Sequence, residues 1–444
     1  MRYKSMASVG TALLAVSLLA GCTSGGKPDP GPTGQVQEKD DGDKGKDKVE
    51  ISFWYGWGGP EEQVIKSLID KFNASQDRII VKGTLEADYS KQLTAITAGS
   101  PPDVASQFGN NSVPYGVDGA MTPLDDYMKK SGITAADFVT GALEQNQYEG
   151  VTYALPVAMH ISMLLYNKDI LAEAGYDQPP ETVQQLAEYF DKLNKIEAGG
   201  EIKRLAFNPN LPIYDFTYLF GGKFYDEEKQ EITPQDPGFL AAMKYNANLW
   251  KKAGGSEKLS PFFNSLGAVN TADDPFFTGK YAMMVAGEWV PSFIKRFAPP
   301  NFNYGIAPLP YDEKHPDKKG SASVSTSTFY IPKGAKHPDE AWEFIRWFLE
   351  PENTAEFNAG IGNLPPVLKA IDQDVFEGVP GFKEYLEASK NPNLFSFPSM
   401  PYTPQYRNEI GVAYTEVLDG KLTPEVAGKQ IADKMKPVLE KYAK

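Results

Sequence analysis

The chain has 444 residues, a formal net charge of −14 at pH 7 and a single cysteine. Such an acidic surface repels phosphate backbones, which argues against a nucleic-acid partner, and one cysteine excludes an intramolecular disulfide. A chain of this length exceeds what one hydrophobic core supports, so we expect two lobes.

The N-terminal residues have the pattern of an export signal. Arg2 and Lys4 precede a short apolar stretch that ends in the letters LAGC at residues 19–22. This stretch is too short to span a bilayer as a helix, but it has the length of a signal-peptide core. The final four residues resemble the bacterial lipobox, which implies cleavage before Cys22 and a diacylglycerol on its thiol, with palmitate as a fatty acid of the lipid. We therefore expect residues 1–21 to be a lipoprotein signal peptide and the protein to be anchored on the extracytoplasmic face of the cell membrane.

Residues 22–48 have the composition of a linker. After Cys22 they are rich in Gly, Pro, Lys and Asp, and they contain one aliphatic residue, Val36. Such a segment buries too little apolar surface to offset the entropy of ordering, so we expect it to be flexible. No later apolar stretch approaches about eighteen residues, so the lipid anchor is the only membrane contact that the sequence predicts.

From Val49 on, strand and helix patterns alternate. Val49–Trp54, Arg78–Val81 and Asp103–Ser106 have the pattern of strands, and apolar residues with helical spacing lie at 65–72 and 89–96. Strands that alternate with helices predict a mostly parallel sheet covered by helices. The alternation resumes with a strand at 161–166, a helix at 182–193, a strand at 204–207, and helices at 340–348 and after 423.

Signals for catalysis or metal binding are sparse. The three histidines lie far apart, and there is no HExxH, CxxC or Gly-x-Ser-x-Gly motif. The turn at 56–59 stands where a phosphate-binding loop would stand, but Glu61 and Glu62 in the following helix would repel a phosphate. We therefore expect no cofactor and no metal. Paired carboxylates for glycoside hydrolysis stay open, because 58 acidic residues offer many pairs.

Aromatic and polar residues cluster at the predicted turns. Sugars present flat C–H faces and a rim of hydroxyls, so their sites combine aromatic rings with hydrogen-bonding side chains. Trp57 and Trp289 each lie near glycine in a turn, which favours stacking on a ligand, although core packing is the alternative for any single aromatic. The clusters are Phe53–Trp57, Gln107–Asn111, Tyr214–Phe216, Gly287–Trp289 and Tyr402–Arg407.

Five motifs together carry a family resemblance. They are Ser100–Val104, Tyr148–Pro156, Leu165–Leu171, Phe277–Met283 and Ile306–Pro310. In this order and spacing, the chain resembles the extracellular solute-binding proteins of ABC importers, in the carbohydrate class that includes maltose-binding protein. The resemblance implies an α/β protein with the two-lobed type II periplasmic-binding-protein fold. Each lobe is expected to be a mostly parallel sheet flanked by helices, and crossing hinge segments are expected to join the lobes.

The same resemblance implies the boundaries of the lobes. The N-terminal lobe is expected to comprise residues 49–157 and 307–349, and the C-terminal lobe residues 158–306 and 350–444. Crossings are expected near Pro156–Ala158, near 305–310 and after the helix that ends at Leu349.

Ligand-binding positions are also carried across by motif. The implied ligand-binding residues are Trp57, Gln107, Phe108, Asn110, His160, Tyr214, Asp215, Glu288, Trp289, Tyr406 and Arg407. Two of them depart from the family pattern, because Glu288 stands where many relatives have proline and His160 replaces the carboxylate of maltose-binding protein. The identity of the sugar therefore stays open.

The resemblance implies a substrate-binding subunit and not an enzyme. The protein would capture a sugar or oligosaccharide in the cleft between the lobes and deliver it, as a monomer, to the permease subunits of an ABC transporter. The alternative is a surface-anchored glycoside hydrolase or polysaccharide lyase, which would turn the sugar over.

Overall fold

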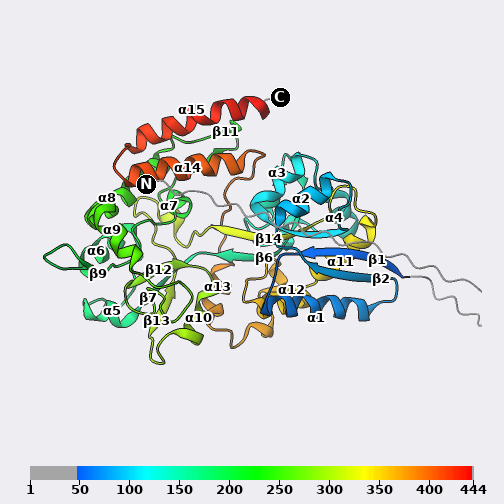
Figure 1. Cartoon of the computed structure of the whole chain (residues 1–444), viewed down its shortest axis with the longest axis horizontal. Coiled ribbons are helices and arrows are strands. Elements are labelled where there is room, and N and C mark those ends of the chain that lie inside the picture. The colour runs from blue at the N-terminus through cyan, green and yellow to red at the C-terminus, as the bar shows by residue number, and fades with distance from the viewer. Residues whose placement is uncertain (1–47, 443–444) are drawn as a thin grey trace, which may run out of the picture. The chain divides into compact units, whose positions relative to one another are not determined.

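The structure is a computed structural model that describes residues 48–442 (Figure 1). The predicted signal peptide, the predicted lipidation site Cys22 and the linker up to residue 47 lie outside the described residues. Within the described part of the chain, no helix combines the length and the apolar character that crossing a bilayer requires.

The first lobe is built on a five-stranded sheet in the order β2-β1-β3-β14-β6. β1 (Val49–Tyr55) runs parallel to β2 (Ile79–Leu85) and to β3 (Val104–Phe108), as the alternation of strands and helices predicted. β14 (Val324–Tyr330) comes from late in the chain and pairs antiparallel with β3 and with β6 (Leu155–Ile161). The sheet is therefore mixed, and β6 and β14 connect it to the second lobe.

α1 (Pro60–Ser75) packs on this sheet through the apolar stripe that the sequence predicted. Proline and two glutamates occupy the first turn of the helix. The negative charges of the glutamates interact favourably with the positive end of the helix dipole. The side chain of Ile69 lies against the backbone of β2 at Gly83. The buried residues of the helix are Ile65, Leu68, Ile69 and Phe72.

α12 (Pro351–Ile361) packs beside α1. Gly360 lies against the side chain of Val64, and Lys71 pairs with Glu356 at 2.6 Å. The family resemblance implied that residues 350–444 belong to the C-terminal lobe, whereas this helix lies against the N-terminal one. The apolar pattern of α12 indicates which of its faces is buried, but not which sheet that face covers.

The second lobe holds a three-stranded sheet in the order β12-β7-β13. β7 (Met163–Asn167) is the central strand, and both β12 (Met283–Ala286) and β13 (Tyr304–Ala307) run antiparallel to it. The expectation of a mostly parallel sheet is therefore wrong for this lobe. β12 and β13 are parallel to each other and are joined through α10 (Val290–Phe297), and β7 lies between them. A strand–helix–strand pattern in the sequence does not reveal such an inserted strand.

The remaining elements surround these two sheets (Figure 1). Helices of the first lobe are α2 (Tyr89–Thr97), α3 (Ser112–Val117), α4 (Asp125–Ser131) and α11 (Pro338–Phe348). The other helices are α5 (Lys168–Glu173), α6 (Val183–Leu193), α7 (Ile213–Leu219), α8 (Pro237–Lys252), α9 (Gly255–Asn264), α13 (Phe382–Ala388), α14 (Thr403–Leu418) and α15 (Pro424–Tyr442). Three short hairpins are β4 (Gln147–Tyr148) with β5 (Val151–Thr152), β8 (Lys195–Ile196) with β9 (Ile202–Arg204), and β10 (Tyr225–Asp226) with β11 (Glu231–Ile232).

The chain crosses between the two sheets at the end of β6. The residue Ser162 alone separates β6 from β7, so this crossing lies at Ile161–Met163. The crossing expected near Pro156–Ala158 therefore falls a few residues too early, inside a strand of the first sheet. The return crossing runs from β13 to β14 through residues 308–323, which includes part of the predicted range.

Candidate ligand-binding cleft

One face of the five-stranded sheet carries polar and aromatic side chains next to the crossing. In the strand register, Phe108 lies opposite Ser327, and Ser325 lies opposite His160. Residues directly opposite each other share a face of the sheet, and so do residues two apart on one strand. Phe108, Ser325, Ser327 and His160 therefore occupy one face. We call this face, together with Glu288 and Trp289, the cleft cluster.

Two aromatic side chains of the cleft cluster are exposed. Phe108, at the end of β3, is 48% exposed, and Trp289, after β12, is 38% exposed. Within residues 48–442 they are the large aromatic side chains that solvent reaches to this extent. Leaving such apolar area in water is unfavourable, and exposed aromatics beside polar groups are typical of ligand sites. Both residues were predicted from the sequence.

The position of the Trp289 indole depends on a neighbouring glycine. The ring lies back over Gly287, where a Cβ atom would collide with the six-membered ring of the indole. The indole also contacts the His160 ring edge to face, with centroids 5.8 Å apart. Trp289 therefore presents its ring next to the polar floor of the cluster.

His160 and Glu288 join the two lobes at this floor. His160 Nδ1 lies 2.7 Å from Oε1 of Glu288, whose side chain is fully buried. Burial acts to lower the pKa of His160, but the charge and hydrogen bond of Glu288, with a further contribution from Glu61, raise this pKa above its ordinary value of 6.5. Glu288 therefore favours the charged form of the imidazole.

Glu61 adds a second carboxylate near His160. It lies in the first turn of α1 and is exposed. Desolvation raises its pKa above the ordinary value, and the nearby charge of His160 opposes this rise. Together with Glu61, the cleft cluster thus offers one imidazole, two carboxylates and two aromatic rings, with hydroxyls from two serines. From the sequence, Glu61 was expected only to repel a phosphate at the turn before α1, because its proximity to His160 arises from the tertiary fold.

The loop after β3 positions Phe108. Gln107 is 1% exposed, and its Oε1 accepts from the backbone N–H of Phe108 and from Asn111 Nδ2. The Phe108 ring meets Tyr89 edge to face at 5.4 Å. Asn110 is half-buried in the same loop. Gln107 therefore stabilises the loop from its buried side, and Phe108 and Asn110 lie nearer the solvent.

Trp57 follows β1 and lies mainly in the core. It is 9% exposed and packs edge-on against Phe329 and Phe357, with ring centroids 5.9 and 5.2 Å away. Its contacts are those of a packing residue. The sequence could not separate it from Trp289, because both follow a strand and lie near glycine.

The four predicted residues of α7 and α14 form a separate group. Asp215 is 4% exposed and accepts from the N–H of Ser323 at 3.0 Å, and Tyr406 is fully buried, with its hydroxyl donating to the Phe224 carbonyl at 3.1 Å. Arg407 lies over the Tyr214 ring at 4.7 Å. The structure thus does not bring these four side chains into the cleft cluster. Asp215 and Tyr406 stabilise the second lobe and its link to the strand β14.

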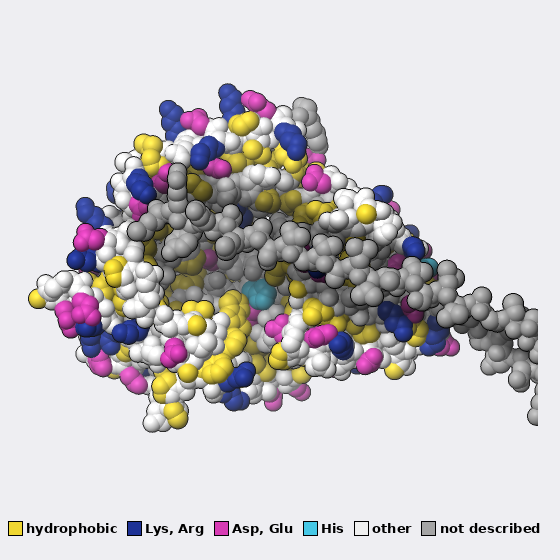
Figure 2. Space-filling view, in the orientation of Figure 1, with side chains coloured by type: hydrophobic (Ala, Val, Ile, Leu, Met, Phe, Trp, Pro, Cys, Tyr) yellow, Lys and Arg dark blue, Asp and Glu magenta, His cyan; other side chains and the backbone are white. Residues whose placement is uncertain are grey.

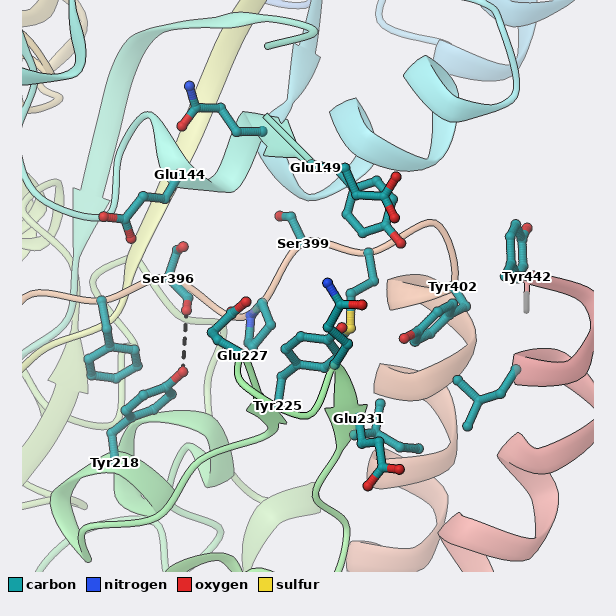
Figure 3. Close-up of a pocket in the computed structure, with 18 of the residues that line it drawn as sticks. Glu144, Glu149, Tyr218, Tyr225, Glu227, Glu231, Ser396, Ser399, Tyr402 and Tyr442 are labelled. Carbon is teal, nitrogen blue, oxygen red and sulfur yellow. Dashed lines mark hydrogen bonds between the residues drawn. The ribbon is translucent and has the colours of Figure 1, made fainter. Parts of the chain in front are cut away.

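A second hollow lies near this group and has a volume of ≈ 790 Å³ (Figure 3). In Figure 3, Glu144 from the first lobe and Glu227 from the second both extend toward it, and the hydroxyl of Tyr218 donates to the Ser396 carbonyl. Desolvation and the charge of Glu227 raise the pKa of Glu144. We call this hollow the tyrosine–glutamate pocket. Its aromatic residues are Tyr148, Tyr218, Tyr225, Phe395, Tyr402 and Tyr442.

The tyrosine–glutamate pocket and the cleft cluster are lined by different residues. Gln145, next to Glu144, accepts from the N–H and the hydroxyl of Thr326. The side chain of Thr326 points away from the face that Ser325 and Ser327 occupy, because neighbouring residues of a strand alternate. No pattern in the sequence indicates the pocket, since its lining comes from segments that are far apart in the chain.

The face of the molecule in Figure 2 is hollowed between the lobes. Hydrophobic side chains border the hollow, and charged side chains of both signs are spread over the surface around it. The described residues contain no group of His, Cys, Asp and Glu side chains that could hold a metal ion. The cleft is thus suited to a ligand that offers both apolar faces and hydrogen-bonding groups.

Two α/β lobes that are joined by crossing strands, with a polar and aromatic cleft at the join, define a periplasmic-type solute-binding protein. The model of the bacterial extracellular solute-binding protein family matches residues 67–384. This is well over half of the chain, so the chain belongs to that family.

Individual relatives agree with this assignment. The sn-glycerol-3-phosphate-binding periplasmic protein UgpB of Shigella flexneri is 25% identical over 428 residues, which cover 89% of this chain and 93% of UgpB. A maltotriose-binding protein of Pyrococcus abyssi is 24% identical over 364 residues, which cover 80% of this chain and 74% of that protein.

Solved structures show the same fold. CpMnBP1, solved with mannotriose bound, is 28% identical with a TM-score of 0.71, covering 86% of this chain and 99% of that one. The sugar-binding protein MalE of Xanthomonas citri has a TM-score of 0.76 at 23% identity, covering 89% and 98%. The predicted type II fold is confirmed, and so is the predicted role as the solute-binding component of an ABC transporter. The relatives named here are binding proteins, so the hydrolase and lyase alternative is not favoured.

Proposed function

We propose that the chain captures a sugar or oligosaccharide in the cleft cluster and delivers it to the permease subunits of an ABC importer. The observation that carries this proposal is the pair of exposed aromatic side chains, Phe108 and Trp289, which come from different lobes and flank the polar floor around His160. Aromatic rings with interspersed donors and acceptors suit the faces and hydroxyls of a sugar. Relatives that bind maltotriose and mannotriose support the same ligand class.

A phosphorylated ligand fits this surrounding less well. One relative is named for binding sn-glycerol 3-phosphate. In this chain, however, Glu288 lies 2.7 Å from His160 and Glu61 is near enough to raise the pKa of His160, so two carboxylates accompany the single imidazole of the cleft cluster. A phosphate would be repelled there. Isothermal titration with sn-glycerol 3-phosphate, mannotriose and maltotriose compares the two classes directly, and tighter binding of the phosphate would contradict the sugar proposal.

Ligand capture would couple to transport through the lobes. A sugar that contacts both Phe108 and Trp289 stabilises the arrangement in which the lobes close on it. Permease subunits that bind the closed arrangement preferentially would then receive loaded protein. A ligand with contacts to one lobe alone would not produce this shift.

Replacing Phe108 with alanine is expected to weaken sugar binding about tenfold, because the variant removes one of the two stacking surfaces. The matched control is Tyr225→Ala, which alters the tyrosine–glutamate pocket and is expected to leave the affinity unchanged. Isothermal titration of both variants with the same sugar is the measurement. If Tyr225→Ala lost affinity and Phe108→Ala did not, the sugar would bind in the tyrosine–glutamate pocket and not in the cleft cluster.

The protein would be held at the extracytoplasmic face of the membrane by a lipid on Cys22, and it would act as a monomer. Changing Cys22 to serine is expected to release a folded, sugar-binding protein from the membrane fraction, because serine provides no thiol for the lipid. Cell fractionation followed by sugar titration of the released protein is the measurement. A Cys22→Ser protein that stayed in the membrane fraction like the wild type would rule out the lipid anchor.

A further inference from the structure

Glu288 is a fully buried carboxylate at the crossing between the lobes, and its hydrogen-bond partners come from the crossing itself. His160 Nδ1 lies 2.7 Å from its Oε1, and the backbone N–H of Ile161 donates to its Oε2 at 3.4 Å. A buried carboxylate without a positive partner is strongly unfavourable. The arrangement is therefore most stable when His160 carries a proton on both ring nitrogens.

The hydrogen bond also sets the direction of the imidazole. Because Nδ1 is taken by Glu288, Nε2 is the nitrogen left for a ligand, and no residue within 48–442 is hydrogen-bonded to it. The His160 side chain is 23% exposed and its ring lies against Trp289. In the charged imidazole Nε2 is a donor, whereas in the neutral ring with a proton on Nδ1 it is an acceptor.

We propose that Glu288 is a positioning residue that keeps His160 protonated and directs its Nε2–H to a hydroxyl oxygen of the sugar that stacks on Trp289. The inference rests on the proposed function of the cleft cluster and adds a specificity-determining role to a residue of the second lobe. A ligand oxygen at this position must accept a hydrogen bond, and a ligand ammonium group there would be disfavoured.

The charged and titratable groups around this pair come from three elements. Glu288 precedes α10, Glu61 lies in the first turn of α1, and Tyr385 of α13 donates its hydroxyl to the Ala286 carbonyl at 2.9 Å. Burial and then the charge of Glu288 raise the pKa of Tyr385, so it stays neutral. Burial lowers the pKa of His160, but the two carboxylates outweigh this effect and raise it. The carboxylates therefore favour the protonated ring, and sugar affinity should fall as pH rises through that raised pKa.

The variant Glu288→Gln tests the proposal, because glutamine keeps the shape and the acceptor oxygen but removes the charge. The chain has three histidines, so their ring resonances can be followed by NMR across a pH titration, with His160→Gln to assign the relevant one. We expect the His160 midpoint to fall by about one pH unit or more in Glu288→Gln. Glu356→Gln, an exposed carboxylate paired with Lys71, is the control and should leave the midpoint in place.

Sugar affinity is measured on the same variants with mannotriose and maltotriose as probes, at about pH 5.5 and about pH 7.5. The wild type is expected to lose less affinity between the lower and the higher pH than Glu288→Gln does, because Glu288 raises the pKa of His160. Glu288→Gln should bind about tenfold more weakly at the higher value and recover at the lower one, because protonation restores the donor. The His160→Gln variant should show no such recovery.

Three outcomes would count against the proposal. An unchanged His160 midpoint in Glu288→Gln would overturn it, and so would an affinity loss of equal size at both pH values together with a lower melting temperature. If the wild type bound neither probe at either pH, the proposed function would fail, and with it the donation to sugar. The NMR midpoint would then still decide whether Glu288 holds the proton on His160.

Discussion

Replacing Trp289 with alanine should weaken sugar binding by about 1–3 kcal/mol, a ten- to hundredfold loss, and leave the unliganded protein almost as stable as before. The indole is 38% exposed, so its removal leaves little cavity in the core. The ring lies beside the polar floor of the cleft cluster and is held there by its close approach to Gly287. Isothermal titration with sugar and the melting temperature of the unliganded variant are the two measurements.

Trp57 provides the matched control, since it is also a tryptophan after a strand and near glycine. It is 9% exposed and packs between Phe329 and Phe357, so Trp57→Ala should lower the free energy of unfolding by about 3–5 kcal/mol through the cavity that it leaves. The two variants are expected to separate binding from stability. A Trp289→Ala protein that melted much lower and bound sugar normally would show that the indole is a packing residue.

The second large effect is expected at Asp103, which joins two distant parts of the first lobe. Its Oδ2 accepts from the backbone N–H and the hydroxyl of Ser52 at 2.8 and 2.9 Å, and its Oδ1 accepts from the N–H groups of Lys336 and His337 at 3.1 and 3.0 Å. The side chain is 6% exposed. Asp103→Ala leaves these donors without a partner and should lower the free energy of unfolding by about 3–5 kcal/mol, measured by chemical denaturation.

Asp88 offers a control of the same residue type. It is an exposed cap of α2 that accepts from the N–H groups of Ser90 and Lys91. Asp88→Ala should lower the free energy of unfolding by only about 1 kcal/mol, because water replaces the lost acceptor. Equal losses for Asp88→Ala and Asp103→Ala would mean that the link from β1 to α11 contributes nothing beyond an ordinary helix cap.

Local patterns predicted those parts of the fold that depend on neighbours in the chain. The stripe of apolar residues in α1 is buried as expected, and the first three strands pair in parallel. The direction of β12 and β13 relative to β7 could not be predicted, because alternation of strands and helices does not tell which strand is inserted between two others. The lobe boundary that the resemblance implied placed α12 in the C-terminal lobe, whereas this helix packs on α1 of the first lobe through contacts between residues far apart in sequence.

Some residues of the candidate site could be predicted before the structure was known, and others could not. The family resemblance implied Phe108, His160, Glu288 and Trp289, and the structure brings them together. Phe108, Glu288 and Trp289 also belong to the aromatic and polar clusters at predicted turns, whereas no local pattern indicates His160. Tyr406 and Asp215 have equally suggestive neighbours, yet they are buried, since burial depends on what packs over them. Their contact with ligand stays a prediction. The carboxylate of Glu61 reaches the site only through the packing of α1, which no local pattern records.

The single residue between β6 and β7 limits how the lobes can move. Two strands that are separated by Ser162 alone cannot have their ends more than about 7 Å apart, so at this point the lobes are effectively pinned together. This short connection prevents the lobes from sliding or separating at this point. It still allows one lobe to rotate relative to the other about Ser162. Such a swing displaces distant parts of the cleft most and its floor least. The protein should thus accommodate longer or shorter solutes by changing its opening angle, while His160 and Glu288 stay in register at the pivot.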